Sequence, residues 1–249
     1  MYNMFTKCSE LTSLDLSNFD TSHVSDMEGM FTGCTDLKSI NTRSFDTSKV
    51  TDMSNMFSYC YALDTLDISN YNTMQVYNMS MMFAYTGLIS LDLSNFKTEN
   101  VRNMECMFQN SSSLEKVNVR SFDTRKVENM KYMFVDCLAL KSLDLSSFVT
   151  SSVKTMYGMF EQCRVLESLD ISKFNTISVT DLSYMFERTA LTELDLSHFK
   201  TPNLKAMVSM FARCSKIKKI NLAGWDTSNV ESMHGLFIEC YELTSIDIT

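Results

Sequence analysis

The 249-residue sequence has few of the residues that punctuate most folds, with one proline and six glycines. This scarcity excludes collagen-like sequence and flexible linkers. Basic residues are also a minority: 22 Lys and Arg stand against 30 Asp and Glu, for a net charge of −8. The acidic balance argues against a nucleic-acid partner held by bulk charge. No apolar run approaches the roughly 20 residues of a membrane-spanning helix, so we expect no membrane insertion.

Motifs for catalysis and for cofactor binding are missing as well. The sequence has no Gly-rich phosphate-binding loop, and His23, His198 and His234 belong to no recurring catalytic arrangement. No CxxC pair and no Cys/His spacing typical of a zinc site occurs. We therefore expect a protein that is not an enzyme and that has no cofactor and no metal site.

Apolar residues make up 45% of the chain, which is enough for a core, and 20 methionines are the most unusual part of the composition. A Met-Phe pair recurs along the whole chain, with Leu-Phe in the last copy. Its phenylalanines are Phe5, Phe31, Phe57, Phe83, Phe108, Phe134, Phe160, Phe186, Phe211 and Phe237. Because the interval is 26 residues, with two exceptions of 25, the chain is a repeat array.

The two shorter intervals carry their deletion at the same place in the unit. Ala84–Leu88 and Glu187–Leu191 are each one residue shorter than Ser58–Leu63. Deletions are tolerated best in loops, so this part of the unit is predicted to be a loop.

Each unit combines two hydrophobic periodicities. Leu14-Asp15-Leu16 and its counterparts alternate apolar and polar residues, which predicts a short strand. From Val24 to Cys34, the apolar residues fall within a stripe about 120° wide on a helical wheel, which predicts an amphipathic helix.

A threonine stands three residues before the first apolar residue of each predicted helix. The column comprises Thr21, Thr47, Thr73, Thr98, Thr124, Thr150, Thr176, Thr201 and Thr227. This position suits an N-cap hydroxyl, and an inward-facing threonine ladder is the alternative.

The sulfur-containing residues also form columns. Eighteen methionines lie in two columns on the predicted core face, which indicates packing rather than soft-metal binding. Seven of eight cysteines form another column, replaced elsewhere by Thr86, Ser111 and Thr189. With helices about 8 to 10 Å apart, these thiols are predicted to be buried and free. Cys106 lies outside the column and is predicted to be exposed and reactive.

The opening Leu11-x-x-Leu14-x-Leu16 resembles that of a leucine-rich repeat. The whole unit, Leu-Asp-Leu-Ser-x-Phe-Asp-Thr-Ser-x-Val-x-x-Met-x-x-Met-Phe-x-x-Cys, is similar to BspA-type leucine-rich-repeat surface proteins of bacteria, including the repeat of mycoplasma lipoproteins. The resemblance implies an α/β fold: a curved, right-handed solenoid of strand-plus-helix units, period 25–26 residues, with a parallel sheet on the concave face. It also implies a secreted or cell-surface protein that functions in adhesion.

One departure from ordinary leucine-rich repeats concerns the end of the strand motif. An aromatic residue such as Phe19, Tyr71 or Trp225 replaces the usual asparagine. The resemblance therefore implies an aromatic spine in place of an asparagine ladder.

Residues 1–249 are predicted to form a single array of about nine units plus a partial one. Met1 aligns with Met27, and residues 245–249 form the last predicted strand. We therefore expect an array truncated at both ends, whose open ends favour end-to-end self-association.

The candidate binding surface is the outward side of the predicted strands. One column there is acidic or amide throughout: Asp15, Asn41, Asp67, Asp92, Asn118, Asp144, Asp170, Asp195, Asn221 and Asp247. Basic residues accompany the asparagines, namely Arg43, Lys116, Arg120 and Lys219. Neighbouring carboxylates about 4.8 Å apart should bond to nearby hydroxyls, with cation binding as the alternative. The alternation of charge suggests electrostatic selection of a partner.

Two further groups of side chains are interpreted as ordinary surface. The basic spot formed by Arg213, Lys216, Lys218 and Lys219 is expected to be a solvated edge. Scattered, half-buried tyrosines are expected at Tyr59, Tyr77, Tyr85, Tyr132, Tyr157 and Tyr184.

The leading hypothesis for function is a non-enzymatic module of a bacterial surface protein, which recognises a protein or glycan through the concave strand face. A stiff spacer that projects another domain is the second hypothesis. The third is an intracellular scaffold or effector, which the free thiols would permit.

Overall fold

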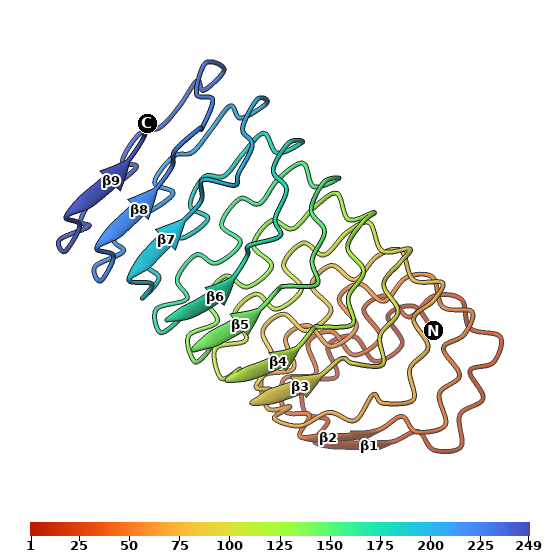
Figure 1. The fold of residues 1–249 in the computed structure, drawn as a ribbon. Coiled ribbons are helices and arrows are strands. Elements are labelled where there is room, and N and C mark those ends of the chain that lie inside the picture. The colour runs from red at the N-terminus through yellow and green to blue at the C-terminus, as the bar shows by residue number, and fades with distance from the viewer.

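The computed structural model describes residues 1–249 as a stack of coils, one coil for each repeat (Figure 1). The two termini lie at opposite ends of the stack. Nine strands of three residues each form one side: β1 (Ser13–Asp15), β2 (Ser39–Asn41), β3 (Ser90–Asp92), β4 (Lys116–Asn118), β5 (Ser142–Asp144), β6 (Ser168–Asp170), β7 (Glu193–Asp195), β8 (Lys219–Asn221) and β9 (Ser245–Asp247). We call this side the strand face.

Strand pairing is parallel and in register within four separate sheets of two or three strands. In β1 and β2, Leu14 pairs with Ile40 and Asp15 pairs with Asn41, one repeat apart. The same register joins β3 to β4, β5 to β6, and β7 to β8 and β9. Equivalent residues therefore stand beside one another along the stack, as the predicted parallel solenoid requires.

The predicted helix is wrong, because no repeat contains one. Two residues of each repeat have left-handed backbone, such as Gly29 (φ 60°) and Gly33 (φ 73°) in one coil and Tyr184 (φ 60°) and Arg188 (φ 57°) in another. Two left-handed residues four positions apart cannot both lie in a right-handed α-helix. The α/β class is corrected to a β-solenoid with turns opposite the strands, and we call that opposite side the turn face. With no helix at all, the protein also has none that could cross a bilayer.

Backbone hydrogen bonds on the turn face run between coils instead of along a helix. The amides of Gly29, Phe31 and Gly33 donate to carbonyls of the next coil at 2.8 to 2.9 Å. The intervening amides of Met30 and Thr32 donate to carbonyls three residues earlier. This arrangement satisfies the backbone without helices, and both sides of each coil are held at the spacing of a sheet.

Aromatic rings stack in two columns inside the coils. The recurring phenylalanines form a continuous ladder from Phe5 to Phe237, with centroids 5.2 to 6.0 Å apart. This spacing replaces the 8 to 10 Å expected for packed helices. The implied aromatic spine is also present, with Phe45 on Tyr71 at 6.4 Å and Phe199 on Trp225 at 6.0 Å. Both methionine columns are buried beside the rings except in the end coils, where Met4 and Met233 are exposed. The core of 63 buried residues runs through the stack.

Eight of the nine threonines form an inward ladder, and Thr227 near the C-terminal end is exposed. The interpretation of the column as a helix N-cap is wrong. Thr124 is fully buried. Its Oγ1 donates to the Val149 carbonyl at 2.9 Å and accepts the Val149 amide at 2.8 Å. Thr47 and Thr150 make the same pair of bonds with Asn72 and Asn175. Each such hydroxyl therefore joins its coil to the next one.

All eight cysteines are free, as predicted, although the coils lie closer than the predicted spacing. Five of the seven column thiols are buried as predicted, whereas Cys8 is exposed and Cys240 is half-buried in the end coils. Column thiols donate to the phenylalanine carbonyl of the preceding coil, for example Cys163 Sγ to Phe134 at 3.1 Å. Ser111 Oγ donates in the same way to Phe83 at 2.7 Å, so the column selects small hydrogen-bond donors.

The prediction that Cys106 is exposed and reactive is wrong. Its side chain is buried, because the residue occupies a left-handed turn position and not the outer surface of a helix. Burial raises the pKa of its thiol to about 11, which suppresses the reactive thiolate.

Candidate recognition surfaces

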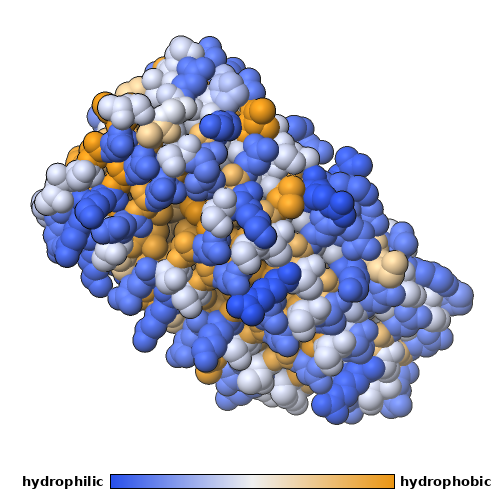
Figure 2. Space-filling model, in the orientation of Figure 1, coloured by the Kyte–Doolittle hydropathy of each residue, from blue (hydrophilic) through white to orange (hydrophobic).

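The strand face carries the predicted column of aspartates and asparagines at the strand ends. Its side chains stand in register, with Asp92 opposite Asn118 and Asp195 opposite Asn221. Seen in the orientation of Figure 1, the molecule is mainly hydrophilic, with hydrophobic atoms showing between rows of polar side chains (Figure 2).

Every residue of this column makes the same bond, including Asp67, which lies in a coil where the predicted strand is absent. The side-chain oxygen accepts the backbone N–H two residues later, for example from Ser17 to Asp15 and from Ser94 to Asp92, both at 3.0 Å. These bonds stabilise the carboxylate form, so the pKa of Asp92 lies below its ordinary value. Asp170 also accepts the Ser172 hydroxyl at 2.7 Å. The column therefore has a structural role in turning the chain.

The basic residues on this face are of two kinds. Arg43 reaches Asp67 at 3.2 Å and Arg120 reaches Asp144 at 2.8 Å, so both arginines bridge neighbouring coils. Lys219 pairs with Glu193 at 3.5 Å, whereas Lys116 has no carboxylate partner. The asparagines bridge in the other direction: Asn41 Nδ2 donates to Asp15 at 3.0 Å, and Asn118 Nδ2 donates to Asp92 at 2.9 Å.

Two shallow depressions of about 310 Å³ each bring the predicted residues together. One is lined by Asp92, Lys116, Asn118 and neighbouring strand residues. The other contains Asp195, Lys219 and Asn221. Arg43 and Arg120 lie outside both. No group of three or more His, Cys, Asp or Glu side chains is placed to hold a metal ion, so the alternative of a cation along the ladder gains no support.

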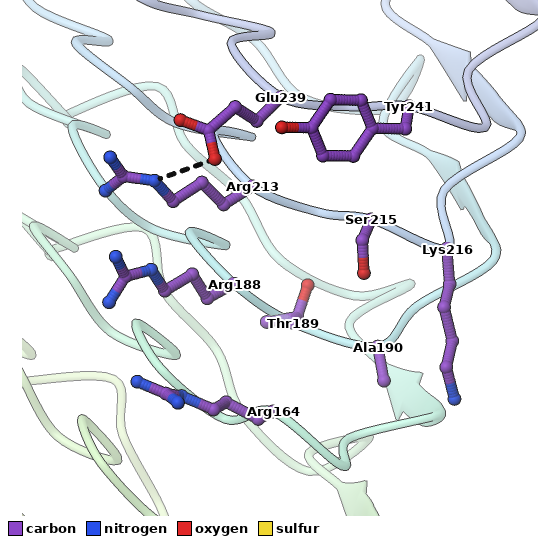
Figure 3. A pocket seen from close by; sticks show the side chains of 9 residues that line it. All are labelled: Arg164, Arg188, Thr189, Ala190, Arg213, Ser215, Lys216, Glu239 and Tyr241. Carbon is purple, nitrogen blue, oxygen red and sulfur yellow. Dashed lines mark hydrogen bonds and ion pairs between the residues drawn. The ribbon is translucent and has the colours of Figure 1, made fainter.

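The turn face contains clusters that the sequence interpretation missed. Tyr59 and Tyr85 stack at 4.4 Å with Tyr61 edge-on to both, so these tyrosines are not scattered. Near the other end of the stack, Arg164, Arg188 and Arg213 line one cavity with Lys216 (Figure 3). Arg213 and Lys216 are thus part of a cluster and not merely a solvated edge. Aligning the repeats at the second left-handed position would have revealed the pairs Tyr59 with Tyr85 and Arg188 with Arg213.

A family model described as "Mycoplasma protein of unknown function, DUF285" matches residues 1–116, 86–169 and 164–248. The chain belongs to this family. The match confirms the predicted resemblance to mycoplasma repeats and is consistent with BspA-type repeats. A search of curated proteins found no match.

One solved structure confirms the leucine-rich-repeat fold. A leucine-rich repeat protein from Bacteroides ovatus is 19% identical with a TM-score of 0.61, over 100% of this chain and 63% of that one. This chain thus spans less than two thirds of that protein. A leucine rich cell surface protein from Faecalibacterium prausnitzii is 16% identical with a TM-score of 0.43, over 100% of this chain and 76% of that one.

Proposed function

We propose that the chain is a non-enzymatic recognition module of a bacterial surface protein, which contacts a protein or glycan through its strand face. The module is exposed at the cell surface or secreted, and it contributes to adhesion. DUF285 membership supports the bacterial surface assignment through the resemblance to mycoplasma lipoprotein repeats.

The observation that carries this proposal is the depression at Asp92, Lys116 and Asn118. The Asp92 and Asn118 side chains are held in place by their turn bonds and by the bond between them. The Lys116 ammonium beside them is exposed and has no carboxylate partner, so a ligand can reach it without breaking an ion pair. Fixed polar groups on a rigid scaffold lose little conformational entropy on binding.

A stiff spacer is the second candidate function. The buried core continues from coil to coil without interruption, which favours an array that transmits position along its length. A spacer would need no particular side chain on the strand face.

Adhesion of beads coated with the chain to cultured epithelial cells separates the two functions. Under the recognition proposal, Lys116→Glu lowers the number of bound beads by about tenfold, because it places a carboxylate beside Asp92. The matched control is Lys97→Glu, which makes the same charge change at an exposed lysine outside the depression. Equal adhesion by the wild type and both variants would support the spacer and reject recognition through this depression.

A further inference from the structure

The cavity between the turn face and the strands near the C-terminal end has a volume of about 460 Å³ and crosses four consecutive coils. Figure 3 shows Arg164, Arg188 and Arg213 in a row on successive coils, with their guanidinium groups extending to the same side. Small side chains form a floor beside this row, and Lys216 lies on the other side of the floor.

The floor lies deeper than the surrounding surface because one coil has one residue fewer there. Between Cys163 and Leu166 the chain has two residues, whereas only Ala190 separates Thr189 from Leu191. Thr189 and Ala190 are both buried, so the missing residue leaves a hollow between the larger side chains of the neighbouring coils.

The charge of the lining is opposite to that of the whole chain. Four cationic side chains and one carboxylate, Glu239, line the cavity, although the chain carries a net charge of −8. Glu187, whose side chain is 9% exposed, lies against Arg188 at 3.7 Å and Arg213 at 3.3 Å. This buried carboxylate helps to hold the two guanidinium groups near each other.

Most guanidinium donors remain free for a ligand. Arg213 donates one N–H each to Glu187 and Glu239, and Arg164 donates two to the Gln162 side chain. The Arg188 guanidinium donates no hydrogen bond to the protein. Because each guanidinium has five N–H groups, about eleven of the fifteen are unused by protein acceptors. Rows of such donors suit the paired oxygens of carboxylates and sulfates.

Backbone geometry does not explain the arginines. Arg188 and Arg213 have φ values of 57° and 59°, in the left-handed region where glycine is favoured, and Gly33 occupies the equivalent position in another coil. A bulky side chain is disfavoured there. Arg188→Gly therefore removes a guanidinium without imposing a new backbone conformation.

The remaining lining favours a ligand larger than a simple anion. Tyr241 is 78% exposed at one end of the floor and offers an aromatic surface, while Ser215 offers a hydroxyl. The guanidinium row and the floor lie side by side, so a sulfate ion could occupy only the row. A sugar ring with an acidic substituent would use both, and the volume suits such a ligand.

We propose that this cavity is a binding site for an acidic saccharide, with the arginine row contacting the carboxylate or sulfate group and the floor beside Tyr241 contacting the sugar ring. This site is separate from the strand face and does not depend on the function proposed there.

The test is calorimetric titration of the whole chain with three probes: N-acetylneuraminic acid, a glucuronic acid disaccharide and a sulfated glucuronic acid disaccharide. Lactose and inorganic sulfate are the comparison ligands. At least one acidic saccharide should bind about tenfold more tightly than either comparison ligand. The preferred probe identifies the acidic group. No binding of any acidic saccharide at about 10 mM, or equal binding of lactose or sulfate, would overturn the proposal.

Variants locate the site on the protein. Arg188→Gly and Arg164→Gln should each weaken binding of the preferred saccharide about tenfold, since each removes a guanidinium from the row. Arg102→Gln is the matched control, because Arg102 is an exposed arginine outside the cavity that faces Glu128 at 3.7 Å. Tyr241→Ala should reduce saccharide binding while leaving sulfate binding unchanged. Wild-type affinity in Arg188→Gly, with an unchanged thermal transition, would reject the cavity as the site.

Discussion

The pKa values of carboxyl groups are shifted in opposite directions on the strand face and beneath the turn face. On the strand face, backbone amides and serine hydroxyls donate to Asp92 and Asp170, and the pKa of each lies below its ordinary value. Beneath the turn face, burial and the neighbouring Glu187 and Asp136 raise the pKa of Glu161 to about 7. Carboxylates thus stabilise the chain turns of the strand face in their charged form. Beneath the turn face, burial disfavours the charged form of Glu161.

The two faces also differ in how much the residue type varies from coil to coil within one column. Aspartate or asparagine fills every coil of the strand-end column because the turn there needs a side-chain acceptor. The second left-handed column of the turn face changes from Tyr59 and Tyr85 to Arg188 and Arg213, because no single side chain is required by the backbone. The constant column builds the fold, and the variable column gives each stretch of the surface its own chemistry.

The largest expected effect comes from the core that both faces share. Phe108 is fully buried between Phe83 at 5.8 Å and Phe134 at 5.2 Å. Phe108→Ala should lower the free energy of unfolding by about 3 to 5 kcal/mol, measured by urea denaturation. Tyr61→Ala on the turn face is the control, since Tyr61 is 54% exposed and should contribute far less. Similar losses in the two variants would contradict a core built on the phenylalanine ladder.

The next largest effect tests the bonds that join the coils at the threonine ladder. Thr124→Val keeps the shape of the side chain but removes the hydroxyl that bonds to both backbone groups of Val149. Leaving these groups unpaired should cost about 1 to 3 kcal/mol of unfolding free energy. Thr249→Val, at an exposed hydroxyl, is the control. A change within error in Thr124→Val would show that the ladder contributes nothing.

The repeat, the parallel strands and the buried columns were predictable because the burial pattern recurs about every 26 residues. The turn face was not predicted correctly, since the spacing of Val24, Met27, Met30, Phe31 and Cys34 suits a helix as well as this series of turns. The distinguishing signal was glycine or asparagine inside the expected helix. Residues of this kind fill the first left-handed position at Asn3, Gly29, Asn55, Gly158 and Gly235. Such residues favour turns over helix interiors.

The candidate surfaces were predictable to different degrees. The strand-face column repeats at one position, so its alignment follows from the register. The cavity escaped notice because Arg164 belongs to a different column from Arg188 and Arg213. Its hollow also depends on the single-residue deletion near Ala190, whose consequence appears only when the coils are stacked.

The opposite electrostatics of the two faces predict a pH dependence of stability. Glu161 faces Glu187, Asp136 and Arg188, and its pKa of about 7 exceeds the ordinary 4.5. The folded chain therefore holds this proton more tightly than the unfolded chain, so the contribution to stability is complete below about pH 4.5 and is lost as pH rises through 7. The change from pH 5 to pH 8 should be about 1 kcal/mol, allowing for solvent screening.

Urea denaturation at pH 5 and pH 8 measures this change. Glu161→Gln should show a smaller loss of stability with rising pH, whereas Glu115→Gln, at an exposed glutamate, should behave as the wild type. This window avoids the strand-face aspartates, whose lowered pKa values make their contribution disappear only as pH falls below about 4. An unchanged pH dependence in Glu161→Gln would contradict the assignment.

The smallest expected effect concerns Asp170 on the strand face, where one substitution should stabilise the fold and another should destabilise it. Asp170 stands in register with Asp144, and the two like charges repel each other. The Asp170 side chain also accepts a hydrogen bond from the Ser172 amide at 3.0 Å. Asp170→Asn keeps that acceptor and adds an amide donor facing Asp144, in the arrangement by which Asn118 donates to Asp92. It should therefore raise the free energy of unfolding by about 0.5 kcal/mol. Asp170→Ala loses the acceptor and should lower it by about 0.5 to 1 kcal/mol. Urea denaturation of both variants decides the matter, because equal destabilisation would mean that the column needs its charge and not merely an acceptor at the turn.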